Sequence, residues 1–189
     1  GAMTILTSVM QFALLPLQGI SQGAQPILSY NYGAKNVERV RKTFRVLLTV
    51  CLTYSALIWA FVMLCPRVFA GIFTPDAELI EFNTALVDYA ATPLRVYCAA
   101  LFLFGIQLAC QMTFVSIGYA VCSIIVAVMR KFVLLIPLIY LLPHLVPDPT
   151  LGVYLAEPVA DTLAVTFTSI LFSHQFRKAL RTLESERSA

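Results

Sequence analysis

Two carboxylates one helical turn apart are the residues of this chain best suited to chemistry. Glu157 and Asp161 lie in an apolar stretch over residues 150–173, and their i, i+4 spacing places them on one face of a helix. At about 1.5 Å per residue, they lie roughly 10 Å and 16 Å from the start of that stretch. Both cannot ionise cheaply away from water. The pair could therefore bind a proton or share a small cation, unless Arg95 or Arg130 neutralises it as a structural ion pair.

A polar face in the first apolar stretch is the second candidate site. Its members follow one another at steps of seven, four, three and four residues: Gln11, Gln18, Gln22, Gln25 and Ser29. This spacing puts them on one side of a helix. An amide that faces lipid leaves polar groups unpaired at high cost, so the face must meet protein or water. It is either the wall of a substrate cavity or a set of hydrogen bonds between helices.

Four further charged residues lie in apolar stretches. Asp88 and Arg95 are seven residues apart and share a helix face. A charge at the bilayer centre costs about 2.5 to 3.5 kcal/mol, so we interpret these two as a structural ion pair. Arg130 and Lys131 come early in the fourth stretch. We expect them to extend toward the cytoplasmic headgroups as an anchor rather than a site.

Five long apolar stretches organise the chain. Hydrophobic residues make up 59% of the sequence, charged residues only 12%, and the mean hydropathy is +0.82, which excludes a soluble domain of this size. The stretches cover residues 3–30, 46–65, 85–111, 120–146 and 150–173. Each is near or above the roughly 20 residues that span a bilayer. The sequence predicts an all-α polytopic membrane bundle with about five transmembrane helices.

Basic residues mark alternate ends of these stretches. They are Lys35, Arg39, Arg41, Lys42 and Arg45 after the first stretch, Arg130 and Lys131 after the third turn, and Arg177, Lys178 and Arg181 after the last stretch. We predict that these ends are cytoplasmic, with residues 177–189 as a cytoplasmic tail and the protein in the cytoplasmic (inner) membrane. Topology thus accounts for the net charge of +3, and no nucleic-acid partner is expected.

The motifs of common enzymes are not found in the sequence. It contains no P-loop, HExxH, GxSxG or dinucleotide-binding fingerprint, and its five cysteines form no CxxC pair. We therefore expect neither an enzyme, nor a metal site, nor a cofactor. Transport driven by an ion gradient, with H⁺ or Na⁺ as the coupling ion, and a purely structural membrane subunit both stay open.

Glycines predict where helices end or approach each other. Gly19 and Gly23 form a small-xxx-small pair that would let a neighbouring helix pack closely. Gly33 follows Asn31 and Tyr32 and is expected to end the first helix in the left-handed cap conformation. Gly118 predicts a tight turn before the fourth helix.

Four segments together resemble the multidrug and toxic compound extrusion (MATE) family of antiporters. They read QGAQPILSYNYGAK over 22–35, IFTPDAELI over 72–80, LLIPLIYLLP over 134–143 and AEPVAD over 156–161. The resemblance covers nearly the whole chain. The turn over 116–121 departs from it, because no basic residue follows Gly118.

This resemblance implies a fold of twelve helices in two lobes, of which residues 4–176 are the part from about the eighth to the twelfth helix. Residues 1–3 read as a tag scar. The family exports cationic amphipathic drugs in exchange for H⁺ or Na⁺ by alternating access. The expected partners are then the lipid bilayer, the N-terminal lobe and small cationic drugs, and the fragment alone is not expected to transport. A flippase of lipid-linked sugars with a related fold and a non-transporting membrane scaffold subunit are the alternatives.

Overall fold

A computed structural model describes residues 2–66, 68, 72 and 90–188, and these residues form helices and turns without a strand. The helices are α1 (Ala2–Gly33), α2 (Val37–Leu64), the short η1 (Leu101–Leu103), α5 (Phe104–Ser116), α6 (Ala120–Val128), the π-helix η2 (Met129–Leu135), α7 (Ile136–Leu145) and α8 (Pro149–Ser188). Residues 90–97 are also helical and lead through a turn into η1. Five spans are long and apolar enough to cross a membrane. The predicted polytopic helical bundle is confirmed.

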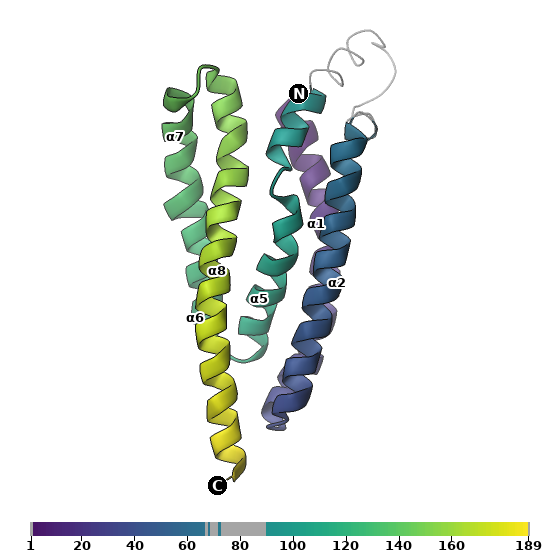
Figure 1. Cartoon of the computed structure of the whole chain (residues 1–189), viewed down its shortest axis with the longest axis vertical. Coiled ribbons are helices and arrows are strands. Elements are labelled where there is room, and N and C mark those ends of the chain that lie inside the picture. The colour runs from purple at the N-terminus through teal and green to yellow at the C-terminus, as the bar shows by residue number, and fades with distance from the viewer. Residues whose placement is uncertain (1, 67, 69–71, 73–89, 189) are drawn as a thin grey trace.

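The bundle has two groups of helices that meet at α5 (Figure 1). On one side of α5 lie α1 and α2, which pack against each other. On the other side α8 packs along α7 and η2. The span that contains α5 is accordingly the most buried, whereas the span formed by α6, η2 and α7 is the most peripheral.

The connection from α1 to α2 differs from the prediction in the position of its left-handed residue. The first helix does end at Gly33, but the left-handed residue is Lys35, with φ 53°. The Asn36 N–H donates to the Asn31 carbonyl at 2.9 Å and the Lys35 N–H donates to the Tyr32 carbonyl at 3.0 Å. These two bonds form a Schellman cap with Lys35 in the position usually held by glycine. The predicted cap at Gly33 is therefore wrong by two residues.

Gly118 takes the predicted turn between α5 and α6. Its φ of 82° suits a residue without Cβ. The Tyr119 N–H donates to the Phe114 carbonyl at 2.8 Å, which closes the end of α5 in the same manner.

The fourth span is continuous but contains a π-helical segment. Its register is shown by the Ile136 N–H, which donates to the Lys131 carbonyl five residues earlier. Pro137 follows, and a proline lacks the donor that an α-helix needs and clashes with the carbonyl four residues before it. A wider turn relieves that clash. Arg130 and Lys131 both lie on this wider turn.

The last helix is longer than a bilayer is thick. Forty residues of α8 correspond to about 60 Å, whereas the hydrocarbon core is about 30 Å. Residues 177–188, predicted as a tail, continue the helix. Just before this end, α8 packs against α2: Phe44 stacks on Phe172 at a centroid distance of 4.6 Å and lies tilted against Phe176 at 5.2 Å. Leu180 and Leu183 are buried beyond them.

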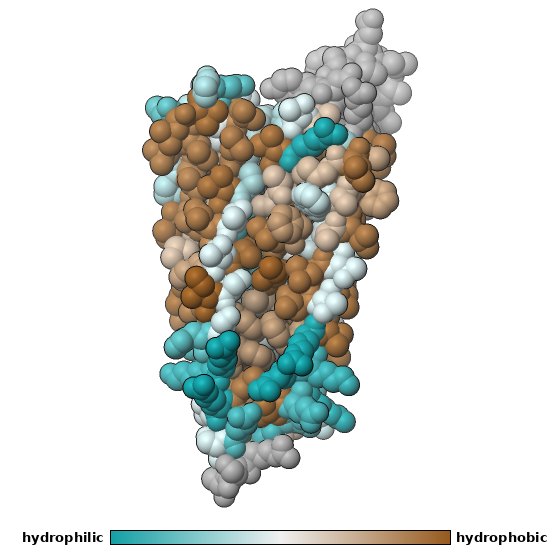
Figure 2. Space-filling view, in the orientation of Figure 1, coloured by the Kyte–Doolittle hydropathy of each residue, from teal (hydrophilic) through white to brown (hydrophobic). Residues whose placement is uncertain are grey.

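Hydrophilic surface gathers at one end of the molecule, where α2 begins and α8 ends, and hydrophobic surface covers the middle (Figure 2). Arg41 and Glu184 approach to 3.8 Å there. The first loop and the end of the last helix thus lie at a common end of the bundle, and the cytoplasmic location of this end stays a prediction.

Close helix packing occurs at Gly105 and Gly152 rather than at the predicted pair. In the described chain, a Cβ added at Gly19 or Gly23 would meet nothing within 4 Å. A Cβ on Gly105 would lie 2.6 Å from the Ser55 Oγ and 2.7 Å from the Cys51 carbonyl oxygen. Gly105 therefore lets α5 approach the backbone of α2.

We expect Gly105→Ala to destabilise the bundle, because the added methyl would push against backbone that cannot move aside. Overpacking costs typically about 1–3 kcal/mol. Gly23→Ala is the matched control, since a helical alanine in open space is neutral or gains about 0.5–1 kcal/mol. The apparent Tm in detergent measures both. Equal melting of the two variants would contradict the close approach of α2 and α5.

Candidate functional site

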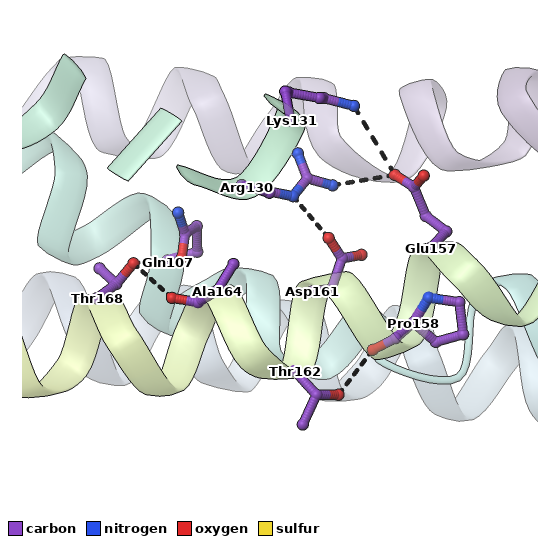
Figure 3. A network of polar contacts seen from close by, with 9 residues as sticks. All are labelled: Gln107, Arg130, Lys131, Glu157, Pro158, Asp161, Thr162, Ala164 and Thr168. Atoms are coloured by element: carbon purple, nitrogen blue, oxygen red, sulfur yellow. Dashed lines mark hydrogen bonds and ion pairs between the residues drawn. The ribbon is translucent and has the colours of Figure 1, made fainter. Parts of the chain in front are cut away.

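The two carboxylates of α8 share one guanidinium. Arg130 donates from Nε to Asp161 Oδ1 at 2.6 Å and from Nη2 to Glu157 Oε1 at 3.1 Å. Figure 3 shows Arg130 reaching from η2 toward the two acidic side chains on α8. Charge-assisted hydrogen bonds of this kind are the strong ones. The predicted common face of Glu157 and Asp161 is confirmed, because one side chain contacts both.

The prediction that Arg130 is a headgroup anchor is wrong. Arg130 is ten residues into the span that begins at Ala120, which places it about 15 Å deep. At that depth a guanidinium needs internal acceptors. The only long apolar helix with two acidic residues at a matching depth is α8, within the part of the chain that is described. Arg130 therefore turns inward even though its span is the most peripheral one.

Two neighbours complete the charge cluster. The Arg130 guanidinium lies over the Phe104 ring, 4.7 Å from its centroid, which is a favourable cation–π arrangement. Lys131 Nζ is 3.9 Å from Glu157 Oε1, but 53% of the Lys131 side chain is exposed, so this contact is weak. Two positive and two negative groups make the cluster neutral overall.

Asp161 has one oxygen that the ion pair does not use. The residue is only 1% exposed, and its Oδ2 has no hydrogen-bond partner among the described residues. A buried acceptor without a partner is uncommon and calls for an explanation. This oxygen is where a proton or a small cation could be held.

A cavity of about 220 Å³ adjoins the cluster. Its walls come from α1, α5, α6 and η2, and its polar lining consists of Gln18, Gln107, Gln111, Arg130 and Lys131. Gln107 is held in place by Thr168, whose Oγ1 donates to Gln107 Oε1 at 3.0 Å. Leu14, Phe104, Leu108 and Ala127 complete the wall. The cavity thus combines amide groups with apolar surface, as ligand sites commonly do.

The predicted glutamine face enters this cavity through one residue. Gln18 lines it, whereas Gln11, Gln22 and Ser29 are exposed on α1 and Gln25 is partly buried. Ser29 Oγ donates to the Ser116 carbonyl at 3.0 Å, so this residue joins α1 to α5. A role for the whole face in a substrate cavity stays a prediction.

The predicted Asp88–Arg95 pair also stays a prediction, because Asp88 lies outside the described residues. Arg95 is exposed and lines a hollow of about 440 Å³ with Cys65 and Pro66, near the end of α2. Of the two arginines that could neutralise the acidic pair of α8, Arg130 is the one that does so.

Sequence reasoning named Arg130 only as one of two arginines that could neutralise the acidic pair, and it missed Gln107 as part of this site. Depth was the available signal for Arg130, since it falls near the middle of an apolar stretch of 26 residues from Ala120 to Leu145. Gln107 and Gln111 are four residues apart in the third stretch, but no local pattern indicates that Gln107 faces Thr168 across 61 residues of sequence.

The family model described as MatE matches residues 1–141. The chain belongs to the MatE family. A match over three quarters of the sequence, on a helical bundle with these spans, confirms the resemblance that the sequence motifs indicated. None of the curated proteins compared matches the chain significantly.

Solved structures of MATE transporters have the same fold. The MATE multidrug transporter DinF-BH, whose structure was solved as a complex, is 32% identical, with a TM-score of 0.75 over 91% of this chain. A MATE in the bent conformation is 17% identical and superposes with a TM-score of 0.83 over 100%. This chain spans only 36% and 39% of the length of those two proteins.

We expect Arg130→Met to lower stability strongly, because it leaves two carboxylates buried without a counter-charge. Removal of one member of a buried ion pair costs about 3–5 kcal/mol. Lys131→Met is the matched control, since its half-exposed contact is worth about 1 kcal/mol or less. The apparent Tm in detergent distinguishes them. The combined variant Arg130→Met, Glu157→Gln, Asp161→Asn should recover most of the lost Tm, because it removes the buried carboxylates together with their counter-charge. A combined variant that melts as low as Arg130→Met would show that Arg130 stabilises the bundle through packing alone.

Proposed function

We propose that this MatE chain is part of the C-terminal lobe of an exporter in the cytoplasmic membrane, which exchanges cationic amphipathic compounds for H⁺ or Na⁺. The observation that carries this proposal is the cluster of Arg130, Glu157 and Asp161 at mid-depth in a transporter fold. Ionisable groups at this depth commonly serve ion pathways and coupling. The lobe alone is not a transporter, because alternating access needs a second half to move against.

The acidic pair supports exchange with H⁺ or Na⁺ because carboxylates accept either ion. Asp161 Oδ2 is free of hydrogen bonds among the described residues. Glu157 Oε1 and Asp161 Oδ1 both bind the Arg130 guanidinium, so the two carboxylates lie side by side. A carboxylate that is already engaged by one cation can release it when another arrives. The cavity beside the pair supplies apolar surface for an amphipathic compound.

Likeness to two transport states supports alternating access. An inward-facing and an outward-facing MATE structure match this chain with TM-scores of 0.81 and 0.82, each at 18% identity. The fold of this chain therefore suits both states about equally well. This is the behaviour expected of a lobe that moves largely as a rigid body.

One observation favours a second candidate, a flippase of lipid-linked sugars. Arg130 and Lys131 line the cavity together with three glutamines, and such a lining also suits phosphate and hydroxyl groups. Binding of a cationic dye to the complete transporter, measured against binding of a lipid-linked sugar, separates the two candidates.

In the complete transporter, we expect Asp161→Asn and Glu157→Gln to lower ion-driven dye efflux. Coupling energies between sites correspond to about 5- to 150-fold, and efflux should fall by a factor in that range because the ion loses a carboxylate ligand. Efflux is measured with sodium and pH varied separately. Glu184→Gln is the control, since it removes an exposed carboxylate from the far end of the same helix. Normal efflux by both site variants at every pH and sodium concentration would remove the coupling role from this pair.

Thiol labelling tests the proposed orientation. Cys65 is exposed near the end of α2, and Lys35 lies at the opposite end of that helix. With Cys122 replaced by alanine, a membrane-impermeant reagent outside intact cells should label Cys65. A Lys35→Cys variant in which Cys65 is also replaced by alanine should stay unlabelled. Permeabilised cells should label both. The reverse pattern would place the basic end of the bundle outside.

A further inference from the structure

We propose that Arg130 is a built-in competitor of the coupling ion, which occupies the acidic pair of α8 when the ion is absent and withdraws into the adjacent cavity when the ion binds. This inference rests on the proposed function. It adds a reason why the coupling ion and the cationic substrate would not be bound at the same time.

The ion and the guanidinium need the same place. Asp161 Oδ1 and Glu157 Oε1 both receive hydrogen bonds from Arg130, at 2.6 and 3.1 Å. A small cation held by both carboxylates would lie where the guanidinium now lies. Two cations at such a separation in a poorly hydrated site repel each other strongly. Occupation by the ion therefore displaces Arg130.

Charge balance indicates which carboxylate changes its partner. The cluster of Arg130, Lys131, Glu157 and Asp161 is neutral, and an added cation would leave it with one excess positive charge. When Arg130 departs, Lys131 remains 3.9 Å from Glu157 and still compensates it. Asp161, with its free and buried Oδ2, is then the carboxylate that exchanges Arg130 for the ion.

The displaced side chain has a place to go. Arg130 already lines the cavity of about 220 Å³, which corresponds to roughly seven waters at about 30 Å³ each. The carbonyl oxygens of Gln18 and Gln111 on its wall can accept from a guanidinium, and the Phe104 ring is already beneath it. The movement is a side-chain rotation and needs no displacement of a helix.

The backbone beneath Arg130 suits such a movement. Arg130 lies on the π-helical turn η2, and π-turns within α-helices are frequent at functional sites. None of the η2 residues is fully buried, so the segment is held by fewer neighbours than α5 or α8.

Exchange follows from this arrangement. With the ion on Asp161, Arg130 fills part of the cavity and repels a cationic compound from it. After the ion leaves, Arg130 returns to the acidic pair and the cavity opens to the compound. The carboxylates are compensated in both states. In the ion-bound state the excess positive charge is that of Arg130, which only the amides and the Phe104 ring of the cavity stabilise.

Several other titratable groups face this site and bear on its response to protons. Tyr97 and Cys98, from the segment before η1, are buried and lie close enough to Asp161 and Glu157 to interact with their charges. Lys131 on η2 and Glu157 on α8 are the remaining described groups. Any pH dependence of ion or dye binding at this site therefore reflects all of these groups and not Asp161 alone.

The test is Arg130→Gln in the complete transporter, with two readouts. The first is the ion concentration that gives half of the ion-induced rise in Tm. Sodium is varied as NaCl with choline chloride added to keep the ionic strength constant, and protons are varied through the pH. Without the competitor this concentration should fall about tenfold or more. The second is binding of a cationic dye, which the ion should antagonise in the parent protein but no longer in the variant.

Two further variants make the result decisive. Arg130→Lys keeps a mobile charge and should retain the antagonism between ion and dye. Arg177→Gln removes an exposed charge from α8 outside the site and should behave as the parent. If Arg130→Gln does not fold, the variant Arg130→Gln, Glu157→Gln keeps Lys131 and Asp161 in balance. It is compared with Glu157→Gln alone in both measurements, so that the loss of the carboxylate is common to the two proteins.

The outcomes separate the inference from the function beneath it. The competitor role would be overturned if Arg130→Gln kept the half-maximal ion concentration and the ion–dye antagonism of the parent while Asp161→Asn lost the ion-induced rise in Tm and the antagonism. The proposed exporter function would not be affected by that result. Full ion dependence in Asp161→Asn would instead overturn the coupling role of the acidic pair.

Discussion

The cost of placing charge in hydrocarbon is the constraint on which the rest of this structure depends. Arg130 lies near the middle of its span, and Glu157 and Asp161 lie two to three turns inside α8. Each charge alone would be expensive there. Together they are compensated, with distances of 2.6 and 3.1 Å. Because the arginine is on η2 and the carboxylates are on α8, this compensation joins the most peripheral span to the body of the bundle. The span also packs along α8 through α7 and η2, although few of its side chains are buried.

The second requirement is that α5 lie close to both of its neighbours. Gly105 lets α5 approach α2, and Gln107 accepts a hydrogen bond from Thr168 on α8 at 3.0 Å. The residue before Gly105, Phe104, provides the ring beneath Arg130. Close packing, a buried amide contact and support of the guanidinium thus come from one turn of α5. The geometry of the site therefore depends on the same packing that holds the two helix groups together.

Polar groups of the bundle serve two different purposes. Those at the end where α2 begins and α8 ends lie on the surface (Figure 2), where we expect them to set the orientation in the membrane. Arg130, Glu157 and Asp161 instead contact one another within the bundle (Figure 3). An ion that exchanges places with Arg130 would use only the second set. The proposed ion exchange and the predicted membrane orientation therefore rest on separate sets of residues.

The sequence by itself determined the five spans, the basic end and the common face of Glu157 and Asp161, because these follow from composition and from the period of a single helix. Tertiary structure decided which arginine meets the acidic pair, which glycine packs closely and that Lys35 rather than Gly33 takes the left-handed conformation. Arg130 is 31 residues from Asp161 and 27 from Glu157. Contacts of that kind depend on how helices cross and on where a π-turn shifts the register, and neither is encoded in local periodicity.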